Sequence, residues 1–431
     1  MQSVKGMRDF YPEQLDQRNW LFLKFRETAF RYGFIEYDTC VLEHEELYIR
    51  KSGEEISEQL YNFVDKGGRK LSLRPELTPS LARMILAKYN EITFPIRWFS
   101  IAQCFRYEKM QKGRKREHYQ WNMDIVGDEN LSAEIELLSA LSNFFQSVGL
   151  DENDVVIKFS NRKILSEFLE MSMIPADKMY EVSVIIDKLD KVGVQNVSTL
   201  LVENGLDQEI VKKIIAFTQA KSIEDLESVL GYSPKAIEEI NTLLDLGKEY
   251  KIDKFLRFTP SLVRGLSYYT GTVFEAFEKS GESRAICGGG RYDHLLETYG
   301  GKPTPFVGFG FGDVVISMIL LEKKMMSSIR FDKKVLVAAY SDNESKEAIA
   351  VTHSLRKENI PTEIDLNYKK IGKTLARADR QGFSHVIIAA PNELIDGELL
   401  IKDLRTGTEE KFKKDSIPNS FKSNRGDITS R

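Results

Sequence analysis

A basic loop between two predicted strands carries the residues of this sequence with the clearest chemical potential. Residues 96–108 and 117–126 are predicted as strands. The loop that joins them, residues 109–116, is longer than a usual hairpin loop of about two to five residues. Six cationic side chains fall within eleven residues of this region: Arg106, Lys109, Lys112, Arg114, Lys115 and Arg116. Because arginine forks match phosphate oxygens, the pattern indicates phosphate binding. A solvated basic loop explains the same composition about equally well.

The second of these strands places polar groups on one face. Gln120, Asn122 and Asp124 alternate with large apolar residues, and alternate residues of a strand point to opposite sides of a sheet. Three amide or carboxylate groups on one face do not belong in an ordinary core. This face therefore either meets solvent or lines a polar pocket.

Two glycine-rich runs indicate close approach of the backbone to another group. Residues 288–290 are three consecutive glycines, which let the chain pass very near a ligand or a neighbouring strand. Gly308, Gly310 and Gly312 recur with a period of two, so they leave one face of a strand bare. Such a strip suits a flat group such as a purine base. A tight turn and close packing are the respective structural alternatives, and the three consecutive glycines do not match a dinucleotide-binding or Walker loop.

Two further segments carry chemically useful side chains. Arg264 lies among apolar residues, where an arginine needs an anionic partner. Tyr268 and Tyr269 follow it and can offer hydroxyls to a polar ligand, although a buried arginine–carboxylate pair explains Arg264 as well. Glu76 and Thr78 share one side of an extended segment, which by itself is typical of an ordinary polar loop.

Composition and missing motifs exclude several classes of protein. The net charge of −4 excludes a uniformly basic protein, and no stretch approaches the ~18 apolar residues of a membrane span. No pair among the five histidines has metal-ligand spacing, and neither HExxH nor GxSxG occurs. The three cysteines are far apart without a CxxC motif, which fits a reducing compartment. The first ten residues lack an apolar signal region, so we expect a cytoplasmic protein with no metal site and no membrane contact.

The pattern of elements divides the 431 residues into two main domains. A helix is predicted over residues 13–32, after which strands and helices alternate until a small all-helical insertion at about 163–250. Strand and glycine-loop patterns then return, and a boundary follows residue 327. Residues 331–431 alternate strands with helices, which is typical of an α/β module with parallel strands.

Together these stretches resemble the histidyl-tRNA synthetases, a family of class II aminoacyl-tRNA synthetases. Residues 105–120 resemble motif 2, residues 264–275 the histidine-specific signature, and residues 288–293 and 305–312 the run into motif 3. Residues 72–79 are similar to the substrate-loop segment and residues 5–13 to the N-terminal opening. The resemblance implies an α+β catalytic domain over 1–327, with a class II antiparallel sheet flanked by helices and the helical insertion. It also implies that residues 331–431 form an α/β anticodon-binding domain.

The resemblance implies a two-step reaction and a role for each candidate residue. Histidine attacks the α-phosphate of ATP to give histidyl-adenylate, and the acyl group then moves to the 3′ end of histidine tRNA, with Mg²⁺ arriving bound to ATP. Arg106 and Arg264 are the implied catalytic residues, on two sides of the α-phosphate. The implied histidine-binding residues are Glu76, Thr78, Arg106, Gln120, Asp124, Arg264, Tyr268 and Tyr269. The implied ATP-binding residues are Arg106, Glu108, Arg114, Arg116, Gly308 and Gly310. Lys109, Gln111 and Lys112 would meet the tRNA, and the enzyme would be a homodimer.

The sequence departs from the family pattern at a few positions. Val315 stands where motif 3 usually carries an arginine that touches ATP, and the usual motif 1 proline near Cys40 is missing. Ser267 stands where Asp is common, and Asp124 where Glu is frequent. Val315 alone favours an alternative, a catalytically silent paralogue that binds histidine and regulates a partner. The intact basic loop, the retained Arg264 and the C-terminal module oppose it.

Overall fold

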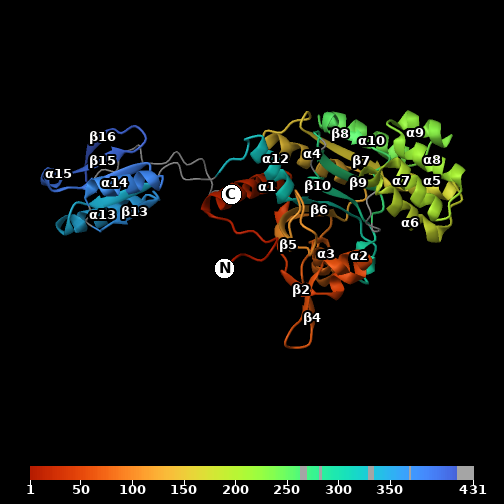
Figure 1. The fold of residues 1–431 in the computed structure, drawn as a ribbon, viewed down its shortest axis with the longest axis horizontal. Coiled ribbons are helices and arrows are strands. Elements are labelled where there is room, and N and C mark those ends of the chain that lie inside the picture. Colours follow the sequence, from red (N-terminus) through yellow and green to blue (C-terminus); the bar gives the residue numbers. More distant parts are fainter. Residues whose placement is uncertain (263–268, 281–283, 329–333, 368–369, 415–431) are drawn as a thin grey trace. The chain divides into compact units, whose positions relative to one another are not determined.

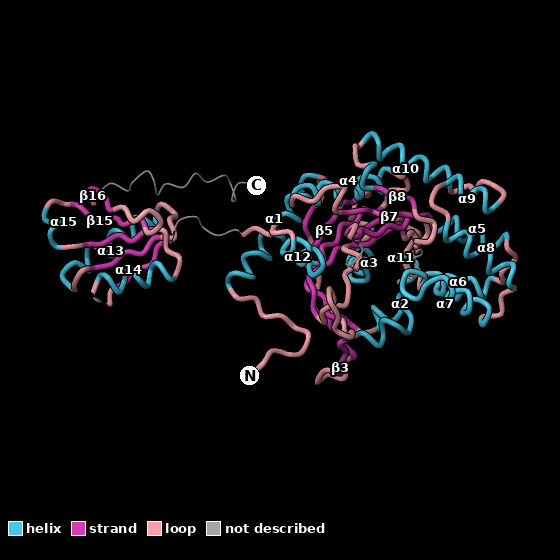
Figure 2. Tube along the Cα trace, turned by 45° about the horizontal axis from the view of Figure 1, so that its top comes forward, coloured by secondary structure: helices cyan, strands magenta, loops and turns pink. Residues whose placement is uncertain are grey.

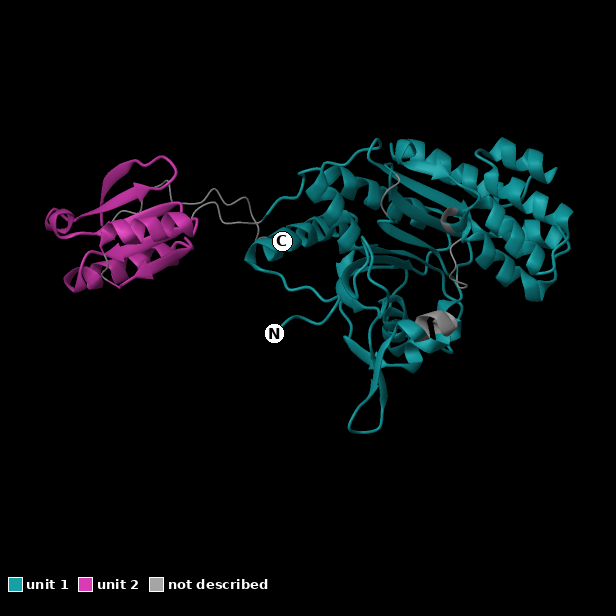
Figure 3. Cartoon of the chain, viewed as in Figure 1, with its two compact units in different colours: residues 1–328 teal, residues 329–431 magenta. Residues whose placement is uncertain are grey.

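The computed structural model describes residues 1–262, 269–280, 284–328, 334–367 and 370–414. The chain forms two compact units, residues 1–328 and 329–431, which Figure 3 shows in separate colours. Each unit has its own sheet.

The first unit is built on an eight-stranded mixed sheet (Figure 1). Its strands run in the spatial order β1 (Ile35–Glu36), β5 (Ile96–Phe105), β6 (Glu117–Val126), β11 (Phe306–Gly312), β10 (Cys287–Arg291), β9 (Thr272–Glu278), β7 (Val155–Asn161) and β8 (Leu256–Phe258). The six central strands pair antiparallel, whereas β1 and β8 pair parallel at the two edges. The predicted antiparallel sheet is therefore confirmed for the centre, with a parallel pair at each edge.

Helices α1 (Pro12–Arg31), α4 (Ser132–Ser147) and α12 (Asp313–Glu322) contribute to the core on one face of this sheet. Trp121 of β6 stacks on Phe25 of α1 at 4.6 Å between ring centroids, and Phe144 of α4 lies 5.1 Å from Phe311 of β11. Trp121, Phe25, Phe144 and Phe311 are all fully buried. Since the apolar residues of β6 point into this core, its alternate residues must point to the opposite side.

A smaller layer of structure adjoins the other side of the central strands. A three-stranded sheet has the order β2 (Leu42–His44), β4 (Lys70–Leu73), β3 (Tyr61–Val64). Helices α2 (Glu46–Gln59), α3 (Thr78–Ala87) and α11 (Leu295–Thr298) accompany it. Buried residues of α3 and α11 share a second core with residues of β6 and β11, among them Leu81, Leu295, Val126 and Phe306.

The predicted helical insertion is confirmed between β7 and β8. It consists of α5 (Arg162–Met171), α6 (Ala176–Ile186), α7 (Leu189–Glu203), α8 (Gln208–Gln219), α9 (Ile223–Leu230) and α10 (Ile237–Glu249), followed by a 3₁₀ turn (Asp253–Phe255). Figure 2 shows these helices grouped at one end of the sheet. Capping residues define both ends of α9: Ser222 accepts a hydrogen bond from Asp225 N at 3.1 Å, and Gly231 ends the helix in the left-handed conformation.

The second unit carries a five-stranded sheet of order β13-β12-β14-β15-β16. Strands β12 (Val335–Ala339), β13 (Thr362–Asp365) and β14 (His385–Ala389) pair parallel, and β15 (Glu398–Asp403) and β16 (Glu409–Lys413) extend the sheet antiparallel. The helices are α13 (Ser345–Lys357), α14 (Ile371–Arg380) and α15 (Pro391–Ile395), with a 3₁₀ turn (Asp342–Glu344). The α/β module is thus confirmed, although the final hairpin β15–β16 was not predicted.

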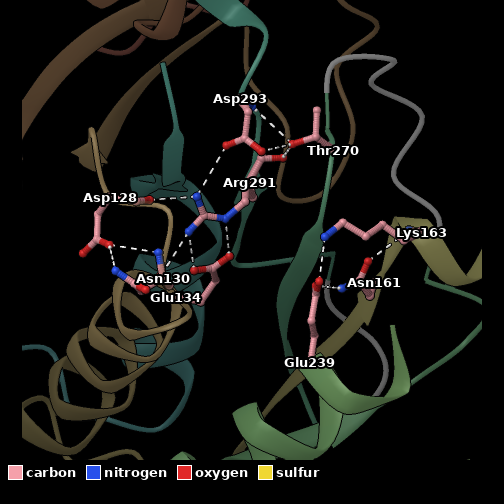
Figure 4. A network of polar contacts seen from close by, with 9 residues as sticks. All are labelled: Asp128, Asn130, Glu134, Asn161, Lys163, Glu239, Thr270, Arg291 and Asp293. Atoms are coloured by element: carbon pink, nitrogen blue, oxygen red, sulfur yellow. Dashed lines mark hydrogen bonds and ion pairs between the residues drawn. The ribbon is translucent and has the colours of Figure 1, made fainter. Parts of the chain in front are cut away.

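A buried arginine fastens β10 to helix α4 in the first unit (Figure 4). Both Nε and Nη2 of Arg291 donate to the Glu134 carboxylate at 2.6 Å. The remaining donors reach the carbonyl oxygens of Asp128 at 2.9 Å and Asn130 at 3.3 Å. The guanidinium is therefore held on several sides, and its partner Glu134 is fully buried.

The backbone of Arg291 is hydrogen-bonded to the segment that leads into β9. Thr270 N donates to Arg291 O at 2.8 Å, and Thr270 Oγ1 donates to Asp293 Oδ2 at 2.8 Å. Tyr269, directly before Thr270, is buried against Tyr292. One arginine thus fixes two neighbouring segments that each carry a buried tyrosine.

A second polar cluster in Figure 4 ties the helical insertion to the sheet. Glu239 of α10 accepts hydrogen bonds from Asn161 Nδ2 and Lys163 Nζ, each at 2.6 Å. Asn161 ends β7 and also caps α5 through Lys163 N at 3.0 Å. The first and last helices of the insertion therefore meet the sheet at one point.

Arg291→Met should lower the free energy of unfolding by about 3–5 kcal/mol, because it leaves the buried Glu134 carboxylate without its charge partner. Urea unfolding followed by tryptophan fluorescence measures the change. The control is Arg26→Met, which breaks the exposed pair with Glu36 and should cost less than about 1 kcal/mol. Equal losses for the two variants would contradict the role given to Arg291.

Candidate active site

A cavity of about 1100 Å³ lies over the polar face of β6. Its lining includes the β5–β6 hairpin, the segment that starts α3, and strands β10 and β11. Charged and amide groups from distant parts of the sequence meet there, which is typical of a site for a polar ligand.

The predicted polar face of β6 lines the cavity and is almost completely buried. Gln120, Asn122 and Asp124 all contribute to its wall. The Tyr292 hydroxyl donates a hydrogen bond to Asp124 Oδ1. Of the two interpretations left open by the alternation, the structure supports the polar pocket rather than a solvent-facing surface.

The alternating glycines of β11 make room for these side chains. Gly308 pairs with Asp124 across the sheet, and a Cβ there would overlap the Asp124 carboxylate and lie 2.7 Å from the Tyr292 hydroxyl. A Cβ at Gly310 would overlap the Gln120 amide. Both glycines also line the cavity. Part of the bare strip is therefore covered by protein side chains, and binding of a purine base there stays a prediction.

The basic hairpin divides its side chains between the cavity and the surface. Arg106, Glu108 and Arg114 line the cavity, and Arg114 Nε lies 2.5 Å from Glu108 Oε2. Arg106 Nε donates to the Pro75 carbonyl oxygen at 3.0 Å, which ties the hairpin to the segment that carries Glu76. Cationic and anionic groups thus alternate along this wall.

Arg116 is not among the residues that line the cavity, and its ATP-binding role stays a prediction. Its guanidinium lies 4.0 Å from the centre of the Tyr107 ring, and its Nε donates to Glu108 O at 3.2 Å. Lys115 of the same hairpin lines the cavity instead. The tip residues Lys109, Gln111 and Lys112 are exposed, where a large partner can reach them.

The remaining predicted residues fall into two groups. Glu76 and Thr78 are buried at the start of α3 and line the cavity together with Tyr269. Arg264 and Tyr268 lie outside the described residues, so their predicted roles rest on the sequence alone.

Several residues of the cavity lining were given no role by sequence reasoning, and four of them serve as examples. Lys115, His118, Arg284 and Tyr292 all belong to the lining. His118 lies two residues before Gln120, so extending the alternation by one step predicts it. Arg284 lies close to the hairpin, with its Cδ 3.9 Å from the position of a Cβ on Gly113. Its proximity depends on the fold, because more than 160 residues separate it from the hairpin.

Comparisons with known proteins agree with this arrangement. The model of the histidyl-tRNA synthetase family matches residues 6–312, and the model of an anticodon binding domain matches residues 334–424. A histidine–tRNA ligase of Arabidopsis thaliana, named chloroplastic/mitochondrial, is 42% identical over 409 residues, 95% of this chain and 84% of the relative. The histidine–tRNA ligase of Opitutus terrae is 37% identical, covering 96% of this chain and 97% of the relative. The crystal structure of histidyl-tRNA synthetase from Nostoc sp. PCC 7120 has a TM-score of 0.80 at 25% identity, covering 96% and 97% of the two chains.

The chain belongs to the histidyl-tRNA synthetase family. The resemblance stated from the sequence motifs is therefore confirmed, as are the fold class and the expectation of an ATP-dependent ligase. None of these comparisons favours the silent regulatory paralogue.

The departure from the family pattern at residues 313–315 has a structural explanation. Asp313 is buried, and its carboxylate accepts hydrogen bonds from Arg8 and from Tyr119 N. Val315 lies against the hairpin, with its Cγ2 3.3 Å from the position of a Cβ on Gly113. At the start of α12, Asp313 therefore pairs with Arg8, and Val315 packs against the hairpin.

Within the described ranges, no cluster of His, Cys, Asp or Glu has the composition of a metal site. No helix among these residues is long and apolar enough to cross a membrane.

His118, which lines the cavity, is held in its neutral form. Its pKa is lowered to about 3, mainly by burial and next by the positive charge of Arg106, while a hydrogen bond with Gln120 opposes the shift in part. Arg8 and Arg114 add smaller effects in the same direction as Arg106. A neutral imidazole among cations adds no further repulsion between positive charges.

The His118 imidazole should not titrate between about pH 8 and about pH 5, because its pKa lies below that interval. NMR spectra of protein with labelled histidine measure this, and His118→Gln assigns the signal. Arg106→Gln should raise the pKa of His118 by removing a nearby positive charge. A midpoint for His118 near pH 6.5 would contradict the description of this wall.

Proposed function

We propose that this protein is a histidine–tRNA ligase that activates L-histidine with ATP and transfers it to the 3′ end of histidine tRNA. The observation that carries the proposal is the shared cavity. It brings the cationic hairpin residues Arg106 and Arg114 beside the buried polar groups of Glu76, Gln120 and Asp124. One half suits phosphates and the other suits a small amino acid with a polar side chain.

The hairpin half of the cavity would bind ATP. Among the described residues, the side chain of Arg106 is hydrogen-bonded only through Nε, to Pro75 O, so its terminal nitrogens can bind the α-phosphate and the histidine carboxylate. Glu108 would orient the adenosine, and Arg114 would bind the outer phosphates with Mg²⁺ carried by ATP. Fixed cations around a phosphorus centre stabilise the charge that develops there, and they need no rearrangement during the reaction. Arg264 would complete this arrangement.

The β6 half of the cavity would select histidine. Glu76 and Thr78 would bind the amino group, and Asp124 together with Tyr269 or Tyr268 would bind the imidazole nitrogens, with Gln120 beside them. These groups are buried, so an apolar amino acid would leave them without hydrogen-bond partners. Unmatched polar groups of this kind reject the wrong substrate strongly.

The partners beyond the cavity follow from the rest of the chain. The exposed hairpin tip, with Lys109, Gln111 and Lys112, would meet the acceptor end of the tRNA, and residues 334–424 would bind its anticodon. A homodimer would form through the edge strand β1, where Ile35 is 66% exposed, and the cytoplasm is the expected location.

ATP–pyrophosphate exchange measured with each of the twenty amino acids tests the activation step. Histidine should support exchange well above every other amino acid, because only its side chain satisfies the buried polar groups. Exchange with no amino acid would instead support a silent histidine-binding regulator.

Arg106→Ala should lower the exchange rate by about 100-fold or more, since losing one charge-stabilising donor costs on the order of 3 kcal/mol. The matched control is Arg97→Ala, near the start of the hairpin's first strand. Arg97 pairs with Glu136 at 2.7 Å away from the cavity lining, so this variant should keep its activity. Arg264→Ala should lower the rate more than about tenfold for the same reason. A near-normal rate for Arg106→Ala would rule out its proposed role.

A further inference from the structure

The first residues of the chain lie against the base of the basic hairpin. Arg116 N donates to Gly6 O at 3.2 Å, and Met7 N donates to Val4 O at 2.9 Å in a tight turn. Gly6 has φ +92°, and a Cβ there would lie 2.8 Å from Arg116 Cγ. The chain can make this turn and approach the hairpin so closely because residue 6 is glycine. We call residues 4–10 the N-terminal arm.

Arg8 of the arm bridges two buried carboxylates. Its Nη2 and Nε lie 3.0 Å and 3.1 Å from the two oxygens of Glu117, and its Nη1 lies 2.8 Å from Asp313 Oδ2. Glu117 and Asp313 are each only 1% exposed. Without Arg8, two negative charges would share one water-poor region, which is strongly unfavourable.

Glu117 and Asp313 belong to two different elements beside the hairpin half of the cavity, the half proposed to bind ATP. Glu117 begins β6 directly after the hairpin, whose strands join at this point through Arg106 N and Arg116 O at 2.9 Å. Asp313 begins α12, and its Oδ1 also accepts from Tyr119 N at 2.8 Å. Arg8 therefore links the hairpin base to the start of α12.

The residues next to these carboxylates line the cavity itself. Val315, two residues beyond Asp313, packs against Gly113 of the hairpin, and His118 follows Glu117 directly. The histidine half is supported differently, since Asp124 is bonded to Tyr292 and Tyr269 packs on the same ring. A change at Arg8 thus acts on one half of the cavity.

We propose that Arg8 is a positioning residue for ATP, which holds the two walls of the nucleotide half at the spacing that binding requires. This inference rests on the proposed function and deepens it, because Arg8 itself does not need to touch the nucleotide. The arm keeps other anchors when Arg8 is changed. Arg18 lies 4.7 Å from the centre of the Phe10 ring, and Phe10 packs edge-on against Tyr119.

The test measures the Michaelis constants of ATP and histidine in the exchange reaction of the full-length Arg8→Met variant. The KM of ATP should rise by about tenfold or more, whereas the KM of histidine should stay within about twofold of wild type. Arg69→Met, which breaks the surface pair with Asp65 between β3 and β4, is the matched control and should leave both constants unchanged. An unchanged KM for ATP, or an equal rise in both constants, would overturn the proposal.

A rescue experiment separates positioning from a general loss of structure. In Arg8→Met/Glu117→Gln/Asp313→Asn the repulsion between the carboxylates is gone and amide hydrogen bonds remain possible, so the KM of ATP should return most of the way to wild type. A triple variant no better than Arg8→Met would overturn the proposal. If Arg8→Met fails to fold, Arg8→Lys takes its place and should likewise raise the KM of ATP but not that of histidine. A single ammonium group cannot bridge both carboxylates as a guanidinium does.

The wild-type protein distinguishes this inference from the proposed function. Wild type that exchanges with histidine, together with a normal ATP KM for Arg8→Met, would reject the role of Arg8 and leave the function standing. Wild type that exchanges with no amino acid would reject the function itself.

Discussion

Strand β6 has to satisfy two environments that exclude each other, and the site depends on that constraint. On one face Trp121 and Met123 are fully buried among the aromatic side chains of α1, α4 and β11. On the other face Gln120 and Asp124 are buried as well, but they line a cavity. Because the side-chain period of a strand is two, a shift of register by one residue would place amides in the aromatic core and Trp121 in the cavity. The packing of Trp121 and Met123 in the hydrophobic core thus fixes the direction in which Gln120 and Asp124 point, although the core residues lie on the face away from the cavity.

The same constraint explains the composition of the neighbouring strands. Polar side chains that lie flat over a sheet need space, and Gly308 and Gly310 supply it beneath Asp124 and Gln120. Gly289 of β10 allows a different close approach, since a Cβ there would lie 2.7 Å from Phe309 Cβ and 2.8 Å from Phe274 Cζ. Glycines therefore leave space on both faces of this sheet. Gly308 and Gly310 make room for polar side chains on the cavity face, and Gly289 makes room for aromatic rings on the core face. Larger residues at these positions would force apart the strands that define the cavity floor.

Periodic and local features of this protein could be predicted from the sequence, whereas contacts between distant segments could not. The alternation of β6, the glycines of β11 and the helical insertion were predictable because each follows from residues a few positions apart. Lys115 and Arg116 are adjacent and equally cationic, yet only Lys115 lines the cavity, because Tyr107 offers its ring to Arg116. Arg284 was missed since nothing near it in the sequence indicates a site. The hairpin β15–β16 was missed because its second strand is short, charged and almost fully exposed, which gives a weak alternation.

The pairing of Arg8 with Asp313 spans 305 residues of sequence and changes how the start of α12 is understood. Considered alone, Asp313 and Val315 depart from the pattern of the family's motif 3. In the structure, burial raises the pKa of Asp313 while Arg8 and Tyr119 N act in the opposite direction, so a cation from the N-terminal arm favours the charged carboxylate. Arg8 in turn meets a second acid, Glu117, at the base of the hairpin. Asp313 thus departs from the motif but belongs to a charge cluster whose other two members, Arg8 and Glu117, lie outside the motif. The effect of Asp313 on the site depends on all three charges together.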